Sequence, residues 1–390
     1  MIRVLIVDDS ALVRKVLTAE LSKCQDIEVV GSAVDPYVAR DKIVRLRPDV
    51  ITLDLEMPRM NGLAFLAKLM KYYPLPVVVV SSLTPKNSEV AIQALELGAV
   101  EVICKQGSAS RTPDISRQLI DAVRAAASAQ ITSQQGTSET SATSSATHPF
   151  PFQASNKVLA IGASTGGTQA IESILRDLPS TSPGTLIVQH MPEQFTMSFA
   201  KRLNQISQME VREARDSDPV GLGVALVAPG NQHMLLQQSG TGYLVRVKAG
   251  PAVNHHRPSV DVLFQSVARS AGSSAVGVLL TGMGADGAKG LLAMHEKGAY
   301  TLAQDEQTCV VFGMPREAVK LGAVDDVVPI QGIPQAIVSF LHAQKKGIPK
   351  PATETMRSSS DLHHRGDRKS ENEIREEFES WINSYKPTKA

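Results

Sequence analysis

Short apolar runs alternate with amphipathic stretches along most of this chain, and one polar segment interrupts the alternation. In the first third, β-rich runs lie at residues 4–7, 28–32, 50–53, 77–80 and 100–104. Apolar residues recur at helical spacing over residues 11–21, 37–46, 63–71, 89–97 and 115–127. This repeated β/α order predicts an α/β domain at residues 1–127, with a parallel sheet and helices on both faces.

The interrupting segment, residues 128–156, is rich in Ser, Thr, Ala and Gln and indicates a flexible linker. A linker of that length spans about 25–35 Å on average, so the flanking domains could touch. Beyond it, strand-like runs at residues 158–161, 185–188, 224–228 and 275–280 alternate with helical patterns at 168–178, 193–206, 259–271, 288–297 and 314–321. We therefore expect a second α/β domain at residues 157–345, with a mainly parallel sheet and hairpin strands near residues 220 and 243–248.

The last part of the chain changes character again. Residues 346–369 are polar and charged, which predicts a disordered tail, and residues 370–386 regain a helical pattern. Ser370 and Glu373 fit a capping box, and Phe378 and Trp381 fall on one face of the predicted terminal helix. Such a helix either docks on its own domain or serves as a tethered peptide for a docking partner.

Bulk properties exclude several classes of protein. The net charge is +1, which argues against a nucleic-acid-binding surface. No apolar stretch approaches the roughly 20 residues of a membrane span, so we expect no membrane insertion. Cys24, Cys104 and Cys309 are scattered without metal-binding spacing, as in proteins of a reducing compartment. The expected protein is cytoplasmic.

Acidic and polar residues stand at the ends of the predicted strands in the first domain. Asp8 and Asp9 end the first strand, Asp54 the third, Ser81 the fourth and Lys105 the fifth. In a doubly wound sheet these ends lie at one edge, where crowded carboxylates repel unless a hard cation such as Mg²⁺ joins them. Asp54 could then accept a phosphoryl group while Lys105 and a serine hydroxyl hold its oxygens. Solvated strand-end charges explain any one of these residues, but the complete set favours a phosphorylation site.

The second domain opens with a glycine-rich turn after its first predicted strand. Residues 162–166 read Gly-Ala-Ser-Thr-Gly and fit G-x-S-x-G, with Ser164 placed where a helix should begin. A serine there faces free N–H groups that could stabilise an oxyanion. The turn does not have the G-x-G-x-x-G spacing of a dinucleotide site.

A nucleophilic serine needs a base and an orienting acid. His190 ends the strand TLIVQ, and Asp286 follows the strand at residues 275–280, so both should gather with Ser164 at one sheet edge. The order Ser–His–Asp differs from that of α/β-hydrolases, which His295 would restore. His295 lies within an amphipathic helical pattern, however, and a helix-surface role is favoured for it.

Residues 1–127 resemble a response-regulator receiver domain, through the motifs VDDS, LDLEMPRMNG, VVVVSS and ICK. The resemblance implies a flavodoxin-like doubly wound sheet and a histidine kinase as phosphodonor. It also implies the following roles: Asp54 as phospho-acceptor, Ser81 and Lys105 as phosphoryl-binding residues, and Asp8, Asp9, Asp54 and the Glu56 carbonyl as Mg²⁺ ligands. Two positions depart from the family pattern: Gln106 stands where many receivers have proline, and Val102 where many have an aromatic switch residue.

Residues 158–319 resemble the catalytic domain of chemotaxis protein-glutamate methylesterases. The matching stretches are IGASTGG, VQHMP, APGNQHM, NHHRPSVDVLF, LLTGMGADGAKG and AQDEQTCVVFGMPREA. The resemblance implies these roles: Ser164 as nucleophile, His190 as general base, Asp286 as orienting acid, Thr165 and Met283 near the oxyanion, and His256 beside the substrate cleft. Ordinary loop packing is an equally good interpretation of His256.

The two resemblances together imply a phosphorylation-activated methylesterase that acts on glutamyl methyl esters in the cytoplasmic region of a chemoreceptor. Some members of the family also deamidate receptor glutamines, and the catalytic domain needs no cofactor. The alternative is a non-catalytic response regulator whose second domain only binds a partner. If the chain is the enzyme, we expect the receiver to pack across the catalytic edge and phosphorylation of Asp54 to loosen it.

Overall fold

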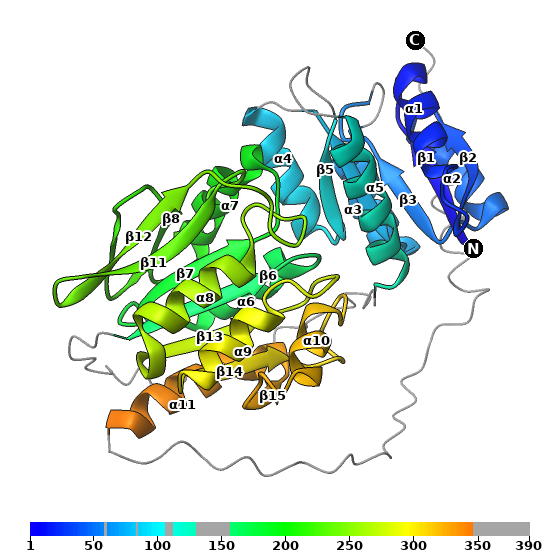
Figure 1. The fold of residues 1–390 in the computed structure, drawn as a ribbon. Helices are drawn as coiled ribbons and strands as arrows, with labels where there is room; N and C mark the ends of the chain where they lie inside the picture. Colours follow the sequence, from blue (N-terminus) through cyan, green and yellow to red (C-terminus); the bar gives the residue numbers. More distant parts are fainter. Residues whose placement is uncertain (58–60, 83–84, 106–111, 130–156, 346–390) are drawn as a thin grey trace, which may run out of the picture.

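The computed structural model describes residues 1–57, 61–82, 85–105, 112–129 and 157–345, which form two α/β units (Figure 1). Most of the predicted linker at 128–156, the predicted tail at 346–369 and the predicted helix at 370–386 lie outside the described residues. Their assignments remain predictions, as do the domain boundaries that depend on them.

The first unit alternates strand and helix throughout. Its elements in chain order are β1 (Ile2–Val7), α1 (Ala11–Leu21), β2 (Ile27–Ala33), α2 (Pro36–Leu46), β3 (Val50–Leu53), α3 (Gly62–Tyr72), β4 (Val77–Ser81), α4 (Pro85–Glu96), β5 (Glu101–Cys104) and α5 (Thr112–Ala127). The strands form a parallel sheet in the order β2-β1-β3-β4-β5. The predicted doubly wound fold is therefore confirmed.

Helices cover both faces of this sheet because alternate strand residues point to opposite sides. On one face, Leu17 of α1 and Leu119 of α5 pack against Val4. On the other face, Ile43 of α2 and Phe65 of α3 belong to a second apolar cluster. Burial of these side chains stabilises the sheet and fixes the edge that carries its strand ends.

The second unit has more elements than the sequence patterns predict. They are β6 (Val158–Ala163), α6 (Gly167–Asp177), β7 (Gly184–Gln189), α7 (Glu193–Ile206), β8 (Glu210–Glu213), β9 (Pro219–Val220), β10 (Val224–Val227), β11 (His233–Ser239), β12 (Gly242–Lys248), α8 (Val260–Ser270), β13 (Ala275–Leu279), α9 (Ala288–Glu296), β14 (Tyr300–Gln304), α10 (Met314–Lys320), β15 (Asp326–Val328) and α11 (Ile333–Lys345), with short 3-10 turns at Gly272–Ser274 and Ile330–Gly332.

A seven-stranded sheet in the order β15-β14-β13-β6-β7-β10-β8 forms the centre of this unit, and every pairing in it is parallel. A separate antiparallel sheet, in the order β11-β12-β9, provides the expected hairpin. The expected mainly parallel sheet is confirmed. Chain order reverses between β6 and β13, and such a reversal is where open α/β sheets place their sites.

The two faces of the large sheet are covered by different helices. Ile171 of α6 and Phe199 of α7 pack on the face that also receives α11. Phe264 of α8 and Leu291 of α9 pack on the opposite face, together with Met314 of α10. All six residues of β6 are buried between these layers, so the strand that leads to Ser164 is firmly held.

The receiver-like unit packs against the second unit through α4, which contacts α7 and α6 (Figure 1). Ile92 and Leu95 of α4 belong to the same buried apolar cluster as Phe195 of α7. At the side of this contact, the Gln169 side chain donates a hydrogen bond to the Leu95 carbonyl at 2.5 Å. The expectation that the first domain packs at the catalytic edge is confirmed.

One arginine joins the two units by ion pairs. Arg202 of α7 lies 2.6 Å from a carboxylate oxygen of Glu96 in the first unit. It also lies 3.0 Å from a carboxylate oxygen of Glu172 on α6, within its own unit. Arg202 is therefore shared between a carboxylate of its own unit and a carboxylate of the other unit.

Candidate active site and phosphorylation site

Ser164, His190 and Asp286 all follow strands of the large sheet at its carboxyl edge. Ser164 comes directly after β6, His190 directly after β7, and Asp286 after β13. Since β13, β6 and β7 are neighbours in the sheet, the topology brings the three loops together. The predicted gathering of these residues at one edge is borne out.

The turn that carries Ser164 depends on two glycines. Gly166 has φ of 76° and precedes α6, which begins at Gly167 rather than at the serine. At Gly282, a Cβ atom would lie 2.7 Å from the Ser164 Cβ, so only glycine lets this second loop pass the serine. The Ser164 N–H donates to the Thr281 carbonyl at 3.0 Å and is not available for an oxyanion.

His190 pairs with Asp286 through one ring nitrogen and leaves the other without a partner. Nε2 of His190 lies 2.9 Å from Oδ2 of Asp286. An ionised carboxylate only accepts hydrogen bonds, so Nε2 carries a hydrogen. In the neutral form of the ring, Nδ1 is then the atom with the lone pair. Nδ1 is buried and has no hydrogen-bond partner among the described residues, Ser164 included.

Several donors converge on Asp286. The Asn254 side-chain amide donates to Oδ1 at 2.7 Å, and the Ser259 hydroxyl donates to the same oxygen at 2.8 Å. The Val260 N–H, in the first turn of α8, donates to Oδ2 at 2.6 Å. Burial alone would raise the pKa of Asp286, but the His190 contact and these hydrogen bonds outweigh it and hold the pKa well below its ordinary value. Asp286 therefore stays ionised and fixes the ring of His190.

His256 lies flat against His190. The two ring centroids are 3.7 Å apart, and the ring planes differ by 7°. Burial, followed by the proximity of His190, lowers the pKa of His256 to about 3. A neutral ring packed in this way keeps the His190 imidazole in one plane and adds no positive charge beside it. The structure thus places His256 against the base, and no hydrogen bond joins it to Ser164 among the described residues.

Two N–H groups remain available near Ser164. Neither the Thr165 N–H nor the Met283 N–H donates a hydrogen bond within the part of the chain that the structure describes. Thr165 follows the serine directly, and Met283 follows Gly282 in the loop that passes beside it. The N–H of the residue after the nucleophile is an oxyanion donor in many serine hydrolases, and Thr165 has that position. The oxyanion role of Met283 stays a prediction.

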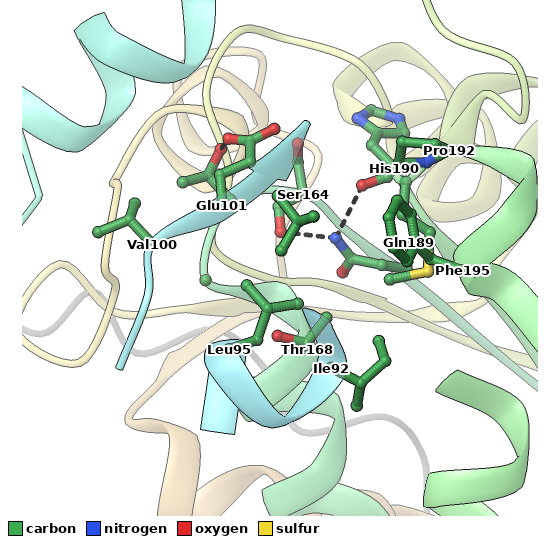
Figure 2. Close-up of a pocket in the computed structure, with 14 residues that line it drawn as sticks. Ile92, Leu95, Val100, Glu101, Ser164, Thr168, Gln189, His190, Pro192 and Phe195 are labelled. Atoms are coloured by element: carbon green, nitrogen blue, oxygen red, sulfur yellow. Dashed lines mark hydrogen bonds between the residues drawn. The ribbon is translucent and has the colours of Figure 1, made fainter. Parts of the chain in front are cut away.

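A pocket at the junction of the two units contains Ser164, Thr165 and His190 on one side (Figure 2). The receiver-like unit contributes the other side, with Leu95 and Glu101 among its residues. Figure 2 also shows the Gln189 side chain, which donates to the Ser164 carbonyl at 2.8 Å and to the His190 carbonyl at 3.1 Å. Gln189 therefore ties the two catalytic loops to each other.

The carboxyl edge of the first sheet gathers a second set of predicted residues. Oxygens of Asp8, Asp9 and Asp54 all lie within 4.8 Å of one another. The Lys105 ammonium contacts Asp54 at 2.5 Å and Asp8 at 2.9 Å. Burial raises the pKa of Asp54 despite its pairing with Lys105. Hydrogen bonds to the two carboxylates outweigh burial and raise the pKa of Lys105.

These residues fit a divalent cation and a phosphoryl group. Three carboxylates against one ammonium leave a net negative charge among hard oxygen ligands, which suits such a cation. The Ser81 hydroxyl is buried and has no hydrogen-bond partner among the described residues, so one donor is left for a further oxygen. The Glu56 side chain is exposed and accepts a hydrogen bond from Ser82 at 2.6 Å. The ligand role of the Glu56 backbone carbonyl stays a prediction.

Sequence reasoning missed the residues that support Asp286 and the receiver residue that enters the pocket. Ser259 carries a detectable signal, because its hydroxyl caps α8 by accepting from the Val262 N–H at 3.4 Å. Asn254 has φ of 51° and gives no sequence pattern that would connect it with Asp286. Glu101 reaches Thr165 from a different unit, so only the folded structure reveals it.

Comparisons with known proteins agree with this organisation. The sequence matches the CheB methylesterase family over residues 159–337 and the response regulator receiver domain over residues 4–115. It is 56% identical over 340 residues to protein-glutamate methylesterase/protein-glutamine glutaminase 2 of Syntrophus aciditrophicus (strain SB), covering 87% of this chain and 99% of that relative. The corresponding protein of Yersinia pestis is 54% identical over 340 residues, with 87% and 96% covered.

Among solved structures, the crystal structure of the Thermotoga maritima CheB methylesterase catalytic domain is 37% identical, covers 47% of this chain and 98% of that chain, and gives a TM-score of 0.46.

The fold and the two sites define a response regulator whose receiver domain is joined to an α/β domain with serine, histidine and aspartate at one sheet edge. More particularly, the chain belongs to the family of CheB protein-glutamate methylesterases/protein-glutamine glutaminases. No helix in the described ranges is long and apolar enough to cross a membrane.

Proposed function

We propose that this chain hydrolyses glutamyl methyl esters on chemoreceptors under the control of receiver phosphorylation. The observation that carries the proposal is the 2.9 Å pair between His190 and Asp286, placed beside Ser164 at the carboxyl edge of the sheet. The names of the relatives supply the substrate class, since they are protein-glutamate methylesterases. A non-catalytic binding domain would not need an ionised Asp286 held by several donors.

The proposed reaction follows from the hydrogen bond between Nε2 of His190 and Asp286, which turns Nδ1 into the accepting atom. Ser164 attacks the ester carbonyl carbon while Nδ1 of His190 takes its proton. The Thr165 and Met283 N–H groups stabilise the oxyanion. His190 then gives the proton to the departing methoxide, and methanol leaves an acyl-enzyme. Water, activated by the same nitrogen, attacks the acyl group and releases glutamate and Ser164.

His190 and Ser164 must approach each other for the first proton transfer. No hydrogen bond joins them among the described residues, and catalytic hydrogen bonds often tighten only when substrate binds. Rotation about χ1 moves the serine hydroxyl between staggered positions without moving the backbone. The fixed partner in the pair is His190, which Asp286 and His256 hold from two sides.

In the receiver, Asp54 attacks the phosphorus of a phosphohistidine on a histidine kinase, and the N–P bond breaks to leave an aspartyl phosphate. Lys105 and Ser81 hold the transferred oxygens. Mg²⁺ bound by Asp8, Asp9, Asp54 and the Glu56 carbonyl would neutralise the negative charge that gathers there. This role of Mg²⁺ is supported by the donor set and by the receiver-domain match.

A second activity at the same site is the deamidation of receptor glutamines. The relatives carry protein-glutamine glutaminase in their names, and an amide carbonyl fits the same nucleophile and base. Ammonia would then leave in place of methanol, with His190 again supplying the proton. Ammonia release from membranes that carry a receptor with glutamine at the modified positions tests this activity.

The test of the main proposal is methanol release from membranes that carry a methylated chemoreceptor, with and without a small phosphodonor and Mg²⁺. We expect release that rises with phosphodonor, disappears in Ser164→Ala and no longer responds to phosphodonor in Asp54→Asn. An active Ser164→Ala variant would exclude the proposed nucleophile. Absence of methanol from every methylated receptor tested would exclude the proposed substrate.

A further inference from the structure

The receiver inserts a glutamate side chain into the pocket that contains the nucleophile. Glu101 is the first residue of β5, and its Oε2 accepts a hydrogen bond from the Thr165 hydroxyl at 2.7 Å. Thr165 directly follows Ser164, and both line the same pocket as Glu101. Figure 2 shows the Glu101 side chain reaching toward Ser164 from the receiver side.

The position of Thr165 is itself fixed. Its carbonyl accepts a hydrogen bond from the Thr281 hydroxyl at 2.9 Å, and Thr281 is buried in the loop after β13. The Thr165 side chain is only 5% exposed, so its hydroxyl has little freedom apart from the direction of the pocket. The hydrogen bond to Glu101 therefore marks a defined point at which the pocket binds a carboxyl oxygen.

Other polar contacts between the domains do not reach Ser164 or Thr165. Arg117 lies 3.1 Å from Nδ1 of His255, and the Cys104 thiol lies 3.9 Å from the Gln194 side-chain oxygen. Glu96 pairs with Arg202, and Gln169 donates to a backbone carbonyl of α4. None of these contacts involves Ser164, His190 or Asp286. Glu101 differs because it contacts the residue next to the nucleophile.

The chemistry of this contact matches the chemistry of the site. Hydrolysis of a glutamyl methyl ester leaves a glutamate side chain, which has the same carboxyl group and the same two methylene groups as Glu101. We propose that Glu101 is an internal product analogue: it occupies the place of the substrate's glutamyl side chain, with its carboxyl group on the Thr165 hydroxyl. This inference rests on the proposed methylesterase function for the identity of the substrate side chain.

An internal product analogue competes with substrate at a high effective concentration, because it is tethered in the same chain. Its removal should strengthen the binding of any glutamyl ligand, however small. Exclusion of a large receptor by the bulk of the receiver would not have this property, since it would leave small ligands unaffected. The affinity of a small ligand therefore separates the two effects.

The experiment uses the full-length, unphosphorylated chain and a small sulfonyl fluoride that labels Ser164. N-acetyl-L-glutamate α-amide is the competing ligand, and its protection of Ser164 is measured in wild type, Glu101→Ala, Glu101→Gln and Glu96→Ala. Glu96→Ala is the matched control, because it removes a carboxylate of the same interface that lies outside the pocket. Circular dichroism checks that each variant is folded.

We expect Glu101→Ala to lower the ligand concentration needed for half-protection by at least about fivefold. Glu101→Gln should show a smaller change, because its amide oxygen can still accept from Thr165. Glu96→Ala should differ from wild type by less than about twofold. Equal protection of wild type and Glu101→Ala would overturn the inference, and so would a Glu96→Ala effect as large as that of Glu101→Ala, since Glu101 would then act only through domain association.

The labelling experiment needs no turnover, so it is independent of the methanol measurement. Suppose that methanol is never released, but the ligand protects Ser164 from labelling better in Glu101→Ala than in wild type. The proposed reaction is then wrong, and the conclusion that Glu101 occupies the ligand's place in the pocket is kept. If methanol is released and Glu101→Ala gains no protection, the reaction stands and the product-analogue inference fails.

Discussion

The two sites of this molecule occupy equivalent places in their sheets but leave different buried atoms without a partner among the described residues: Nδ1 of His190 in one and the hydroxyl of Ser81 in the other. In the catalytic domain, Asp286 receives donors from His190, Asn254, Ser259 and the start of α8. In the receiver, the buried Ser81 hydroxyl lacks a partner among the described residues. The catalytic site is preorganised, as electrostatic catalysis requires. The phosphorylation site keeps binding capacity for a group that arrives later.

The largest effect is expected when a carboxylate is replaced by an amide at each site. Asp286→Asn should reduce methanol release by about 10³–10⁴-fold, because an asparagine no longer holds His190 in the required tautomer. Asp54→Asn should leave the unphosphorylated rate nearly unchanged and remove the response to phosphodonor. Steady-state methanol release with and without phosphodonor measures both. A Asp286→Asn loss of less than about tenfold would show that Asp286 does not orient the base.

A pair of helix caps gives the next largest contrast. Ser259 caps α8 and also donates to Asp286, whereas Ser10 caps α1 in the receiver by accepting from the Val13 N–H at 3.4 Å. We expect Ser259→Ala to lower the free energy of unfolding by about 2 kcal/mol and also to slow catalysis. Ser10→Ala should lower it by about 1 kcal/mol without slowing catalysis.

Urea unfolding and methanol release, measured on both variants, decide between the two roles of Ser259. Unimpaired catalysis in Ser259→Ala would mean that its hydroxyl acts on α8 alone.

The stacked histidine predicts a pH dependence of stability. An unfolded histidine has a pKa near 6.5, whereas burial lowers the pKa of His256 to about 3. Between these values the unfolded chain binds a proton that the folded chain does not, so stability falls as the pH is lowered. His256→Phe keeps a flat ring against His190 and should remove up to about 1.4 kcal/mol per pH unit from this slope.

Urea unfolding at several pH values between about 4 and 7 measures that slope. Equal slopes in wild type and His256→Phe would show that the His256 ring is protonated in the folded protein.

The smallest effect is expected at Ser81. Ser81→Ala removes a buried hydroxyl that has no hydrogen-bond partner among the described residues. The free energy of unfolding should therefore stay within about 1 kcal/mol of the wild-type value or rise. Phosphorylation of Asp54 by a small phosphodonor should nevertheless be slower, because one donor to the phosphoryl oxygens is lost. Phosphate incorporation and urea unfolding are the measurements. A large loss of stability would show that the hydroxyl has a structural partner, and the contrast between the sites would weaken.

Strand-end residues were the most predictable part of this protein. The helices Ala11–Leu21 and Glu193–Ile206 were predicted with their observed bounds, and Ser164, His190 and Asp286 were placed correctly at one edge. These predictions succeeded because parallel topology converts a position in the sequence into a position in space. They required no knowledge of side-chain packing.

Elements without a clear pattern were missed. β14 (Tyr300–Gln304) is a short apolar run whose periodicity does not distinguish strand from helix, and α11 (Ile333–Lys345) carries a proline at its second position. The contacts of Asn254 and Glu101 join segments distant in sequence. Such contacts depend on loop conformation and on the docking of two domains, which local patterns do not encode.

The ion pairs of Arg202 affect how easily the contact between the two domains can break and form again. Its ion pair with Glu96 crosses the interface, while its pair with Glu172 stays within the catalytic domain. When the domains part, the guanidinium keeps one carboxylate and gains water, and Glu96 also becomes hydrated, so separation strands no charge in an apolar environment. The contact that then remains between the domains is the apolar packing of α4 against α7. If phosphorylation parts the domains as expected, Arg202 would therefore re-form its pair with Glu96 from a hydrated state, and no unpaired charge would have to leave an apolar environment.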